Sequence, residues 1–304
     1  MQRSRKKEVL KIEEVPKGAL ILWTATGSPL EVKHHLDALG FLNISYLDLI
    51  KYSDLSLVEP PFIMDFEKDF RENYAEYSTT YKCLADKKSK EIFTKVINFK
   101  ISFDYDFMQG FSNDHKGQYF DREILPEMKN ICFFDGGGYV GDTAAEVIKH
   151  YPEYEKIWCI EPIAENLRIA KRDLADESKI AFIECGIGSR KETLFFNEEK
   201  SFSSIYGKGT QSVEIDTIDN IVKSKVDYIK LDIEGAEQDA IDGAVATIRD
   251  YHPTLAICIY HKAEDWYKIP QKVLAIRDDY SVYLRHYMEG IFESVIYFIP
   301  KKVS

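Results

Sequence analysis

From residue 131 onward, short apolar runs alternate with amphipathic stretches. Two amphipathic stretches predict helices near 142–150 and 164–176, and a third helix is expected after Gly235. Unbroken apolar strands separated by helices are typical of a parallel sheet covered on both faces. The pattern therefore predicts an α/β fold with a mostly parallel sheet. Its expected strands are 131–135, 156–161, 179–185, 226–234 and 254–260.

The C-terminal end of the chain has a different pattern, without a helix between its apolar runs. Residues 281–287 and 293–300 are apolar runs separated by a short turn that contains Gly290, which predicts a terminal antiparallel pair. Two further short strands, 192–197 and 212–216, are expected between the third and fourth core strands.

The N-terminal part has a pattern of its own. A strand at 18–23, a helix at 30–40 and a strand at 43–49 predict a small βαβ-like segment over residues 1–60. A Glu-Pro-Pro break at 59–61 ends it, and a mostly helical connector or lid follows to residue 125. Within the connector, Asp86 is expected to cap a helix whose apolar face carries Ile92, Phe93, Val96 and Ile97. Residues 126–304 form the third segment.

Composition excludes some partners. The chain has 304 residues and a formal net charge of -11, which disfavours nucleic-acid binding. No apolar segment approaches the roughly 20 residues that span a bilayer, and no apolar signal core follows the basic N-terminus. We therefore expect a soluble, intracellular, cytoplasmic protein. The five cysteines form no C-x-x-C and are expected to be reduced and mostly buried.

The stretch FFDGGGYVGDT, residues 133–143, contains the G-x-G-x-x-G that is typical of dinucleotide-binding folds. Asp135 directly precedes the first glycine, and the local sequence offers no compensating cation. A pyrophosphate about 4 Å from this carboxylate would be repelled by on the order of 1 kcal/mol even in water. S-adenosylmethionine has no phosphate and carries an ammonium and a sulfonium, so Asp135 favours this cofactor over NAD. Close backbone approach at Gly136, Gly137, Gly138 and Gly141 is expected to admit it.

Two further strand ends point to a nucleoside. Glu161 lies 20 residues after Gly141, the spacing at which an acid bridges ribose hydroxyls in such folds. Glu184 and Cys185 end the third strand, where we expect the adenine edge to lie.

Several motifs together resemble the FkbM-type S-adenosylmethionine-dependent methyltransferases. They are FFDGGGYVGDT (133–143), EPIAEN (161–166), VEIDTID (213–219), YIKLDIEGAEQDAIDGA (228–244), ICIYH (257–261) and YLRHY (283–287). The resemblance implies a Rossmann-like class I methyltransferase sheet, with Thr143 and Asn166 as further cofactor contacts. It also implies O-methylation of a sugar, a glycan precursor or another small molecule. One departure is Gly138-Tyr139, where the family often has Ala-Asn.

Methyl transfer to an alcohol requires a base or a metal. Asp232 and Glu234 are expected on one face at the end of the fourth strand, and His261 closes the fifth. We predict that Asp232 lies closest to the sulfonium and the acceptor, that His261 is the base, and that Glu234 orients the acceptor. Magnesium or manganese on these three residues is the alternative, although the main prediction includes no metal.

Other residues near these strands have two interpretations each. Lys230 is expected to pair with a carboxylate of the Asp232 cluster, and Glu237 to compensate the dipole of the next helix. Arg285 is interpreted either as part of a charge pair or as an acceptor contact. Tyr119 and Phe120 either cover the cofactor or only pack.

Three functions remain open. An O-methyltransferase acting on a small-molecule or glycan hydroxyl is preferred, because the family resemblance implies it. The acidic, aromatic-rich composition adds only that a neutral polyol suits the surface better than nucleic acid does. A nicotinamide-dependent oxidoreductase or epimerase is the second, and a non-catalytic cofactor-binding protein is the third. A homo-oligomer is compatible with all three.

Overall fold

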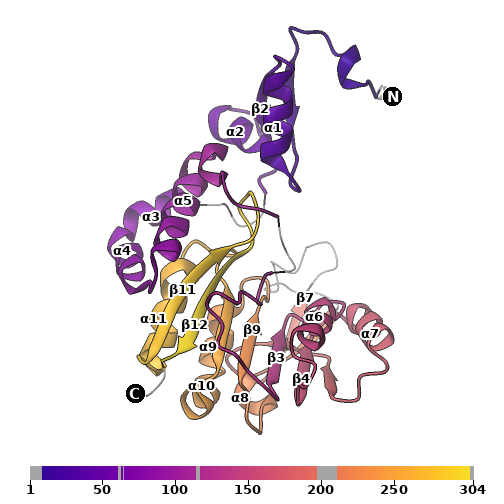
Figure 1. Cartoon of the computed structure of the whole chain (residues 1–304), viewed down its shortest axis with the longest axis vertical. Helices are drawn as coiled ribbons and strands as arrows, with labels where there is room; N and C mark the ends of the chain where they lie inside the picture. Colours follow the sequence, from indigo (N-terminus) through magenta and orange to yellow (C-terminus); the bar gives the residue numbers. More distant parts are fainter. Residues whose placement is uncertain (1–8, 61–62, 64, 114–116, 197–210, 302–304) are drawn as a thin grey trace.

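The computed structural model describes residues 9–60, 63, 65–113, 117–196 and 211–301, and within these ranges a seven-stranded sheet is the centre of the C-terminal half (Figure 1). Its strand order is β11-β12-β10-β9-β3-β4-β5. All neighbours pair in parallel except β12, which is antiparallel to both β10 and β11. This confirms the predicted mostly parallel sheet with an antiparallel C-terminal pair. The strands are β3 (Cys132–Gly136), β4 (Lys156–Ile160), β5 (Ile180–Ile183), β9 (Tyr228–Leu231), β10 (Thr254–Cys258), β11 (Tyr280–His286) and β12 (Ser294–Pro300).

Both faces of this sheet are buried. Phe134 and Ile229 face one hydrophobic cluster, while their chain neighbours Phe133 and Tyr228 face the other. Successive strand residues point to opposite faces, so unbroken apolar runs are needed where both faces are covered. The helices of this half of the chain are α6 (Asp142–His150), α7 (Ala164–Asp173), α8 (Ile218–Ile221), α9 (Glu237–Asp242), α10 (Val245–Tyr251) and α11 (Asp265–Ile276).

The two extra strands predicted before β9 belong to a separate small sheet. Its order is β6-β8-β7, with β6 (Gly186–Ile187), β7 (Glu192–Phe196) and β8 (Gln211–Asp216). Because β6 begins only three residues after β5 ends, the small sheet lies beside the carboxyl end of β5.

The N-terminal segment forms the predicted βαβ unit, which projects away from the large sheet in Figure 1. After the short helix η1 (Ile12–Glu14), β1 (Leu20–Trp23) and β2 (Leu42–Ser45) pair in parallel around α1 (Pro29–Ala38). The prediction of a strand over 43–49 is wrong in its second half, because α2 (Tyr46–Tyr52) begins there. Ser45 caps this helix: its hydroxyl accepts from the Asp48 N–H, and the Asp48 carboxylate accepts from the Ser45 N–H. Such reciprocal local bonds favour a helix start over a continued strand.

The connector is helical as predicted. It contains α3 (Phe66–Glu72), α4 (Tyr74–Cys83), α5 (Lys87–Ser102) and the short helix η2 (Tyr105–Met108). Asp86 caps α5 by accepting from the Ser89 N–H at 2.7 Å, and the predicted apolar face is buried. Helix α5 packs on the edge strand β11 and α4 packs on α11, which attaches the connector to the outer edge of the sheet.

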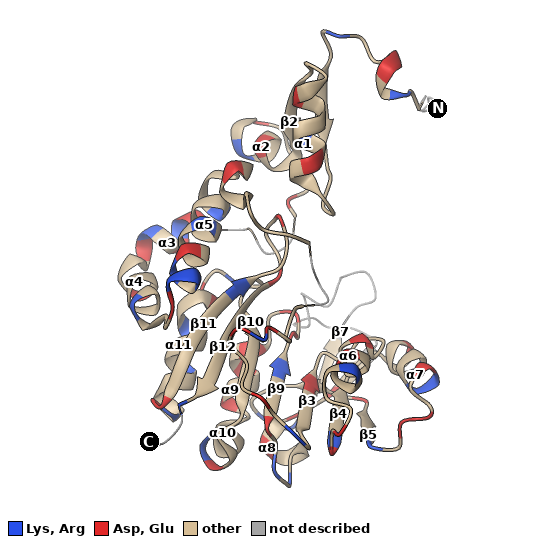
Figure 2. Cartoon of the chain, in the orientation of Figure 1, with Lys and Arg blue, Asp and Glu red and all other residues tan. Residues whose placement is uncertain are grey.

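Charged side chains of both signs are spread over the helices α3, α5 and α7 (Figure 2). The basic run at residues 3–7 lies outside the described residues. Of the five cysteines, Cys83 is exposed, the other four are buried, and all are free thiols. None of the described helices has both the length and the apolar character needed to span a bilayer.

Candidate active site

A cavity of about 860 Å³ opens at the carboxyl ends of β3, β4 and β9. Ligands of open α/β sheets bind at this edge. The connector closes one side of the cavity with residues 118–120, and the small sheet closes another with residues 185–188. The predicted site residues that line it are Gly137, Thr143, Glu161, Asn166, Cys185, Asp232 and Glu234.

The glycine loop is shaped mainly by the protein's own packing. A Cβ on Gly137, whose φ is +80°, would lie 1.8 Å from the Asp232 carbonyl oxygen. A Cβ on Gly138 would lie 2.4 Å from the Cys159 sulfur. Gly136 and Gly141 are similarly enclosed by side chains of the core and of α7. Of these four glycines, Gly137 lines the cavity.

Asp135 is fully buried beneath the loop and does not line the cavity. Its carboxylate lies 3.1 Å from the Lys230 ammonium, which also donates to the Gly137 carbonyl oxygen at 2.7 Å. Burial raises the pKa of Asp135 to about 6, and Lys230 partly offsets this rise. The expectation that no cation compensates Asp135 is therefore wrong. The two residues are neighbours in the β3–β9 register, which no local pattern reveals.

Glu161 connects the loop to α7. Its carboxylate accepts from the backbone N–H groups of Tyr139 and Ile163, at 3.0 Å each, and from the Asn166 amide at 3.2 Å. A carboxylate has about four acceptor positions, so these three bonds leave one for a ligand hydroxyl. Glu161 therefore presents one remaining acceptor position at the cavity wall.

The end of β5 is divided between the cavity and the surface. Cys185 is buried and lines the cavity beside residues 186–188. Glu184 is exposed and lies outside the lining.

His261 is bound between carboxylates after the end of β10. Its Nδ1 lies 2.9 Å from the fully buried Glu237, and its Nε2 lies 3.5 Å from Asp232 and 3.9 Å from Glu234. These contacts bring the three predicted catalytic residues together. The predicted strand alternation does not do this, because β9 ends at Leu231 and Glu234 has a φ of +56°. Instead, a tight turn returns Glu234 to the cluster.

Contacts between the side chains of this cluster shift their pKa values. Burial alone would lower the pKa of His261, but Glu237, Asp232 and Glu234 together raise it to about 9. Burial raises the pKa of Glu234. Asp232 is partly buried, which alone would raise its pKa, yet Lys230 and His261 hold that pKa below the usual value. Asp232 and Glu234 line the cavity, whereas the His261 side chain is only 1% exposed and lies behind them.

Two tyrosines hold Asp232; the sequence analysis left the role of Tyr119 open and did not name Tyr260. The Tyr119 hydroxyl donates to one carboxylate oxygen at 3.0 Å and the Tyr260 hydroxyl donates to the other at 3.1 Å. Tyr119 also lines the cavity, so it takes part in the site rather than only in packing. Its ring lies 5.4 Å from the Lys230 ammonium. Tyr260 directly precedes His261, and this adjacency was the only available signal for it.

Among the described residues, Asp232, Glu237 and His261 form a group whose ligand atoms lie within 4.8 Å of one another. The 2.9 Å contact between Glu237 and the ring Nδ1 is the distance of an N–H···O hydrogen bond. This contact orients the imidazole so that Nε2 faces Asp232 and Glu234.

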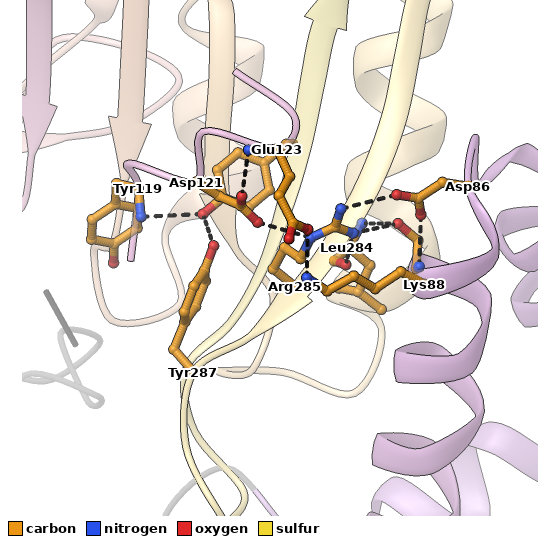
Figure 3. A network of polar contacts seen from close by, with 10 residues as sticks. Asp86, Lys88, Tyr119, Asp121, Glu123, Leu284, Arg285 and Tyr287 are labelled. Atoms are coloured by element: carbon orange, nitrogen blue, oxygen red, sulfur yellow. Dashed lines mark hydrogen bonds and ion pairs between the residues drawn. The ribbon is translucent and has the colours of Figure 1, made fainter. Parts of the chain in front are cut away.

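Arg285 fastens the connector to the sheet (Figure 3). Its guanidinium bonds Asp86 at the start of α5 and Asp121 in the segment before β3, both at 2.9 Å. Arg285 is buried and does not line the cavity. Arg285 therefore forms charge pairs and is not an acceptor contact, and both of its acids lie in the connector. Figure 3 also shows Tyr119, whose N–H donates to the Tyr297 hydroxyl at 3.1 Å.

Comparison with known proteins agrees with this geometry. A family model described as the methyltransferase FkbM domain matches residues 135–287, about half of the chain. The chain is similar in structure to the methyltransferase FkbM from Methylobacillus flagellatus, with a TM-score of 0.77 and 24% identity over 92% of this chain and 73% of that chain. This likeness shows the fold, and its coverage extends beyond the large sheet.

Other similarities are weaker. A putative rRNA methylase from Clostridium thermocellum matches with a TM-score of 0.38 and 9% identity, over 66% of this chain and 96% of that chain. An rRNA methylase from Streptococcus thermophilus matches with the same TM-score and 12% identity, over 58% and 91%. None of the curated proteins matches the chain.

Proposed function

The chain belongs to the FkbM methyltransferase family, and from this premise we propose that it transfers a methyl group from S-adenosylmethionine to a hydroxyl. The observation that carries the proposal is the arrangement of acids along one cavity. Glu161 lies at the end of β4, and the Asp232–Glu234–His261 cluster lies two strands away, beyond β9. The acceptor is proposed to be a hydroxyl of a sugar, a glycan precursor or another small molecule.

The lining residues fit a ligand that carries an ammonium and a sulfonium. Asp232 and Glu234 present carboxylates at the end of β9. Of the described lysines in the lining, Lys230 is committed to Asp135 and Lys262 is exposed at the rim. A cationic group near Asp232 is therefore stabilised, whereas a pyrophosphate there is repelled.

The proposed contacts follow the order of the strands. The Gly137 backbone and Glu161 bind the cofactor across β3 and β4, with Thr143 and Asn166 beside them. Residues 185–187 form the wall next to the adenine. Asp135 acts indirectly, because it holds the Lys230 ammonium against the loop.

The cofactor supplies the reactive methyl, and the protein orients the acceptor and takes up its proton. Asp232 and Glu234 touch the acceptor, because they line the cavity. The proton of the hydroxyl passes these carboxylates and is accepted by His261 Nε2. Glu237 stabilises the imidazolium through Nδ1. The positive charge lost from the sulfonium is thereby replaced by the proton on His261, so the charge of the site is conserved.

Binding and turnover experiments test this function. Calorimetry should show binding of S-adenosylmethionine and S-adenosylhomocysteine, and none of NADH. The variants His261→Ala and Asp232→Asn should lower methyl transfer to the true acceptor at least tenfold. Binding of NADH alone would point to the oxidoreductase. Cofactor binding with transfer rates unchanged in both variants would refute the proposed cluster.

A further inference from the structure

The strand order divides the cavity into two halves at Asp232. Towards β3 and β4 lie Gly137 and Glu161, the proposed cofactor contacts. In the other direction the sheet continues through β10 to β12. Glu293, directly before β12, also lines the cavity. The half between Asp232 and Glu293 is therefore beyond the cofactor contacts and next to the proposed catalytic cluster.

Gln118 is the polar centre of this second half. Gln118 is only 5% exposed, and it lines the cavity. Its amide nitrogen donates to Glu293 at 2.5 Å and to the Tyr119 hydroxyl at 3.0 Å. Within the described ranges no residue donates to its amide oxygen. Because Gln118 lines the cavity, this oxygen can accept a hydrogen bond from a ligand there.

Two residues of this half of the cavity have unusual backbone conformations. Tyr119 has a φ of +67° and Glu293 a φ of +60°, both in the left-handed region that non-glycine residues rarely adopt. Other tyrosines stabilise the Tyr119 backbone: Tyr228 donates to its carbonyl oxygen at 2.6 Å, and Tyr297 accepts from its N–H. Such strain persists where surrounding contacts enforce it, and it concentrates at binding sites.

The polar groups in the half of the cavity between Asp232 and Glu293 indicate which type of ligand it binds. An amide oxygen, a carboxylate and a phenol accept hydrogen bonds from hydroxyl groups. The carboxylates of Asp232 and Glu293 repel a phosphate or a carboxylate at the same place.

We propose that Gln118, Tyr119 and Glu293 form the acceptor subsite, and that it binds a neutral polyhydroxylated compound and rejects its phosphorylated form. The inference rests on the proposed function, because it assigns the remaining half of the cavity to the acceptor. It adds three residues and a class of acceptor, and it places the connector in the active site.

Ligand-observed NMR tests the subsite without turnover. The full-length protein, saturated with S-adenosylhomocysteine, is mixed with methyl α-glucopyranoside or with glucose 6-phosphate, and saturation transfer is measured. The neutral glycoside should show transfer and the phosphate none. In Gln118→Leu the affinity for the glycoside should fall about five- to tenfold, as expected for a lost buried hydrogen bond.

The matched control is Gln109→Leu, which removes the same group from an exposed connector position. It should leave the glycoside signal unchanged. Absence of glycoside binding, equal binding of the phosphate, or an unchanged signal in Gln118→Leu would each overturn the subsite. Calorimetry of S-adenosylhomocysteine on the same samples separates the two proposals. Failure of that binding contradicts the proposed function, whereas normal cofactor binding with a negative glycoside result contradicts only the subsite.

Discussion

The Asp135 carboxylate lies 3.1 Å from the Lys230 ammonium, and both side chains are buried under the glycine loop. The pair neutralises the charge that had distinguished a cationic cofactor from a pyrophosphate. Asp135 therefore supports the loop, because Lys230 binds the Gly137 carbonyl oxygen. In the proposed function, selection of a cationic cofactor therefore depends on Asp232 and Glu234, which line the cavity.

Removal of one member of this pair should destabilise the fold. Asp135→Asn leaves the Lys230 ammonium buried without its carboxylate, which costs about 3–5 kcal/mol when a buried pair is broken. The double variant Asp135→Asn with Lys230→Met removes the unpaired charge and should recover part of that loss. Urea denaturation measures both, with the exposed Lys149→Met as control. A double variant less stable than Asp135→Asn alone would contradict this account.

Glu161 should control cofactor affinity. Glu161→Ala removes the acceptor of two backbone N–H groups and the proposed ribose contact, so the dissociation constant for S-adenosylhomocysteine should rise about tenfold or more. Calorimetry gives this value directly. Glu165→Ala, an exposed acid two residues into α7 that pairs with Arg168, is the matched control. Equal affinities in the two variants would exclude Glu161 from the cofactor site.

The rate of methyl transfer should rise with pH. His261 accepts a proton only when neutral, and its pKa is about 9, so kcat/KM should increase up to about that pH. Glu237→Gln removes the largest contribution that raises this pKa, so the rising limb should move to lower pH. The maximum rate should also fall, because the ring loses the carboxylate that orients it. Asp242→Asn, at the end of the same helix, should leave the profile in place. A pH-independent rate would exclude His261 as the base.

Arg285 should matter for stability more than for cofactor binding. Arg285→Lys cannot bond Asp86 and Asp121 together as the guanidinium does, so the free energy of unfolding should fall by about 2 kcal/mol. Affinity for S-adenosylhomocysteine should change less than threefold, because Arg285 does not line the cavity. Denaturation and calorimetry measure the two effects, with the exposed Arg249→Lys as control. A large loss of cofactor affinity with an unchanged free energy of unfolding would instead place Arg285 in the cofactor site.

Chelation separates the base from the metal alternative. If His261 acts as the base, EDTA should leave both cofactor affinity and transfer rate unchanged, because Glu237 already occupies Nδ1. Metal analysis of the purified protein provides a readout that does not depend on turnover. A rate that falls with EDTA and recovers with Mg²⁺ or Mn²⁺ would support the metal alternative, for which the structure groups Asp232 and His261 with Glu237 rather than with Glu234.

Much of the site could be predicted because it follows strand ends. The carboxyl ends of parallel strands meet at one edge, so acids placed after β4 and β9 had to lie near the glycine loop. The error over residues 43–49 arose where a capping box competed with an apolar run. Glu184 was placed by the same reasoning as Cys185, yet adjacent residues of an extended segment point in opposite directions.

The sequence by itself determined the α/β sheet, its helices and the acids at its edge, because apolar periodicity and capping are local properties. Only the tertiary structure decided which charges meet. Asp135 and Lys230 are paired by strand register, and Tyr119 reaches Asp232 across 113 positions of the chain. Such contacts depend on strand order and on the path of the connector. Both are settled by the packing of the whole chain, and neither is encoded in a neighbouring stretch of residues.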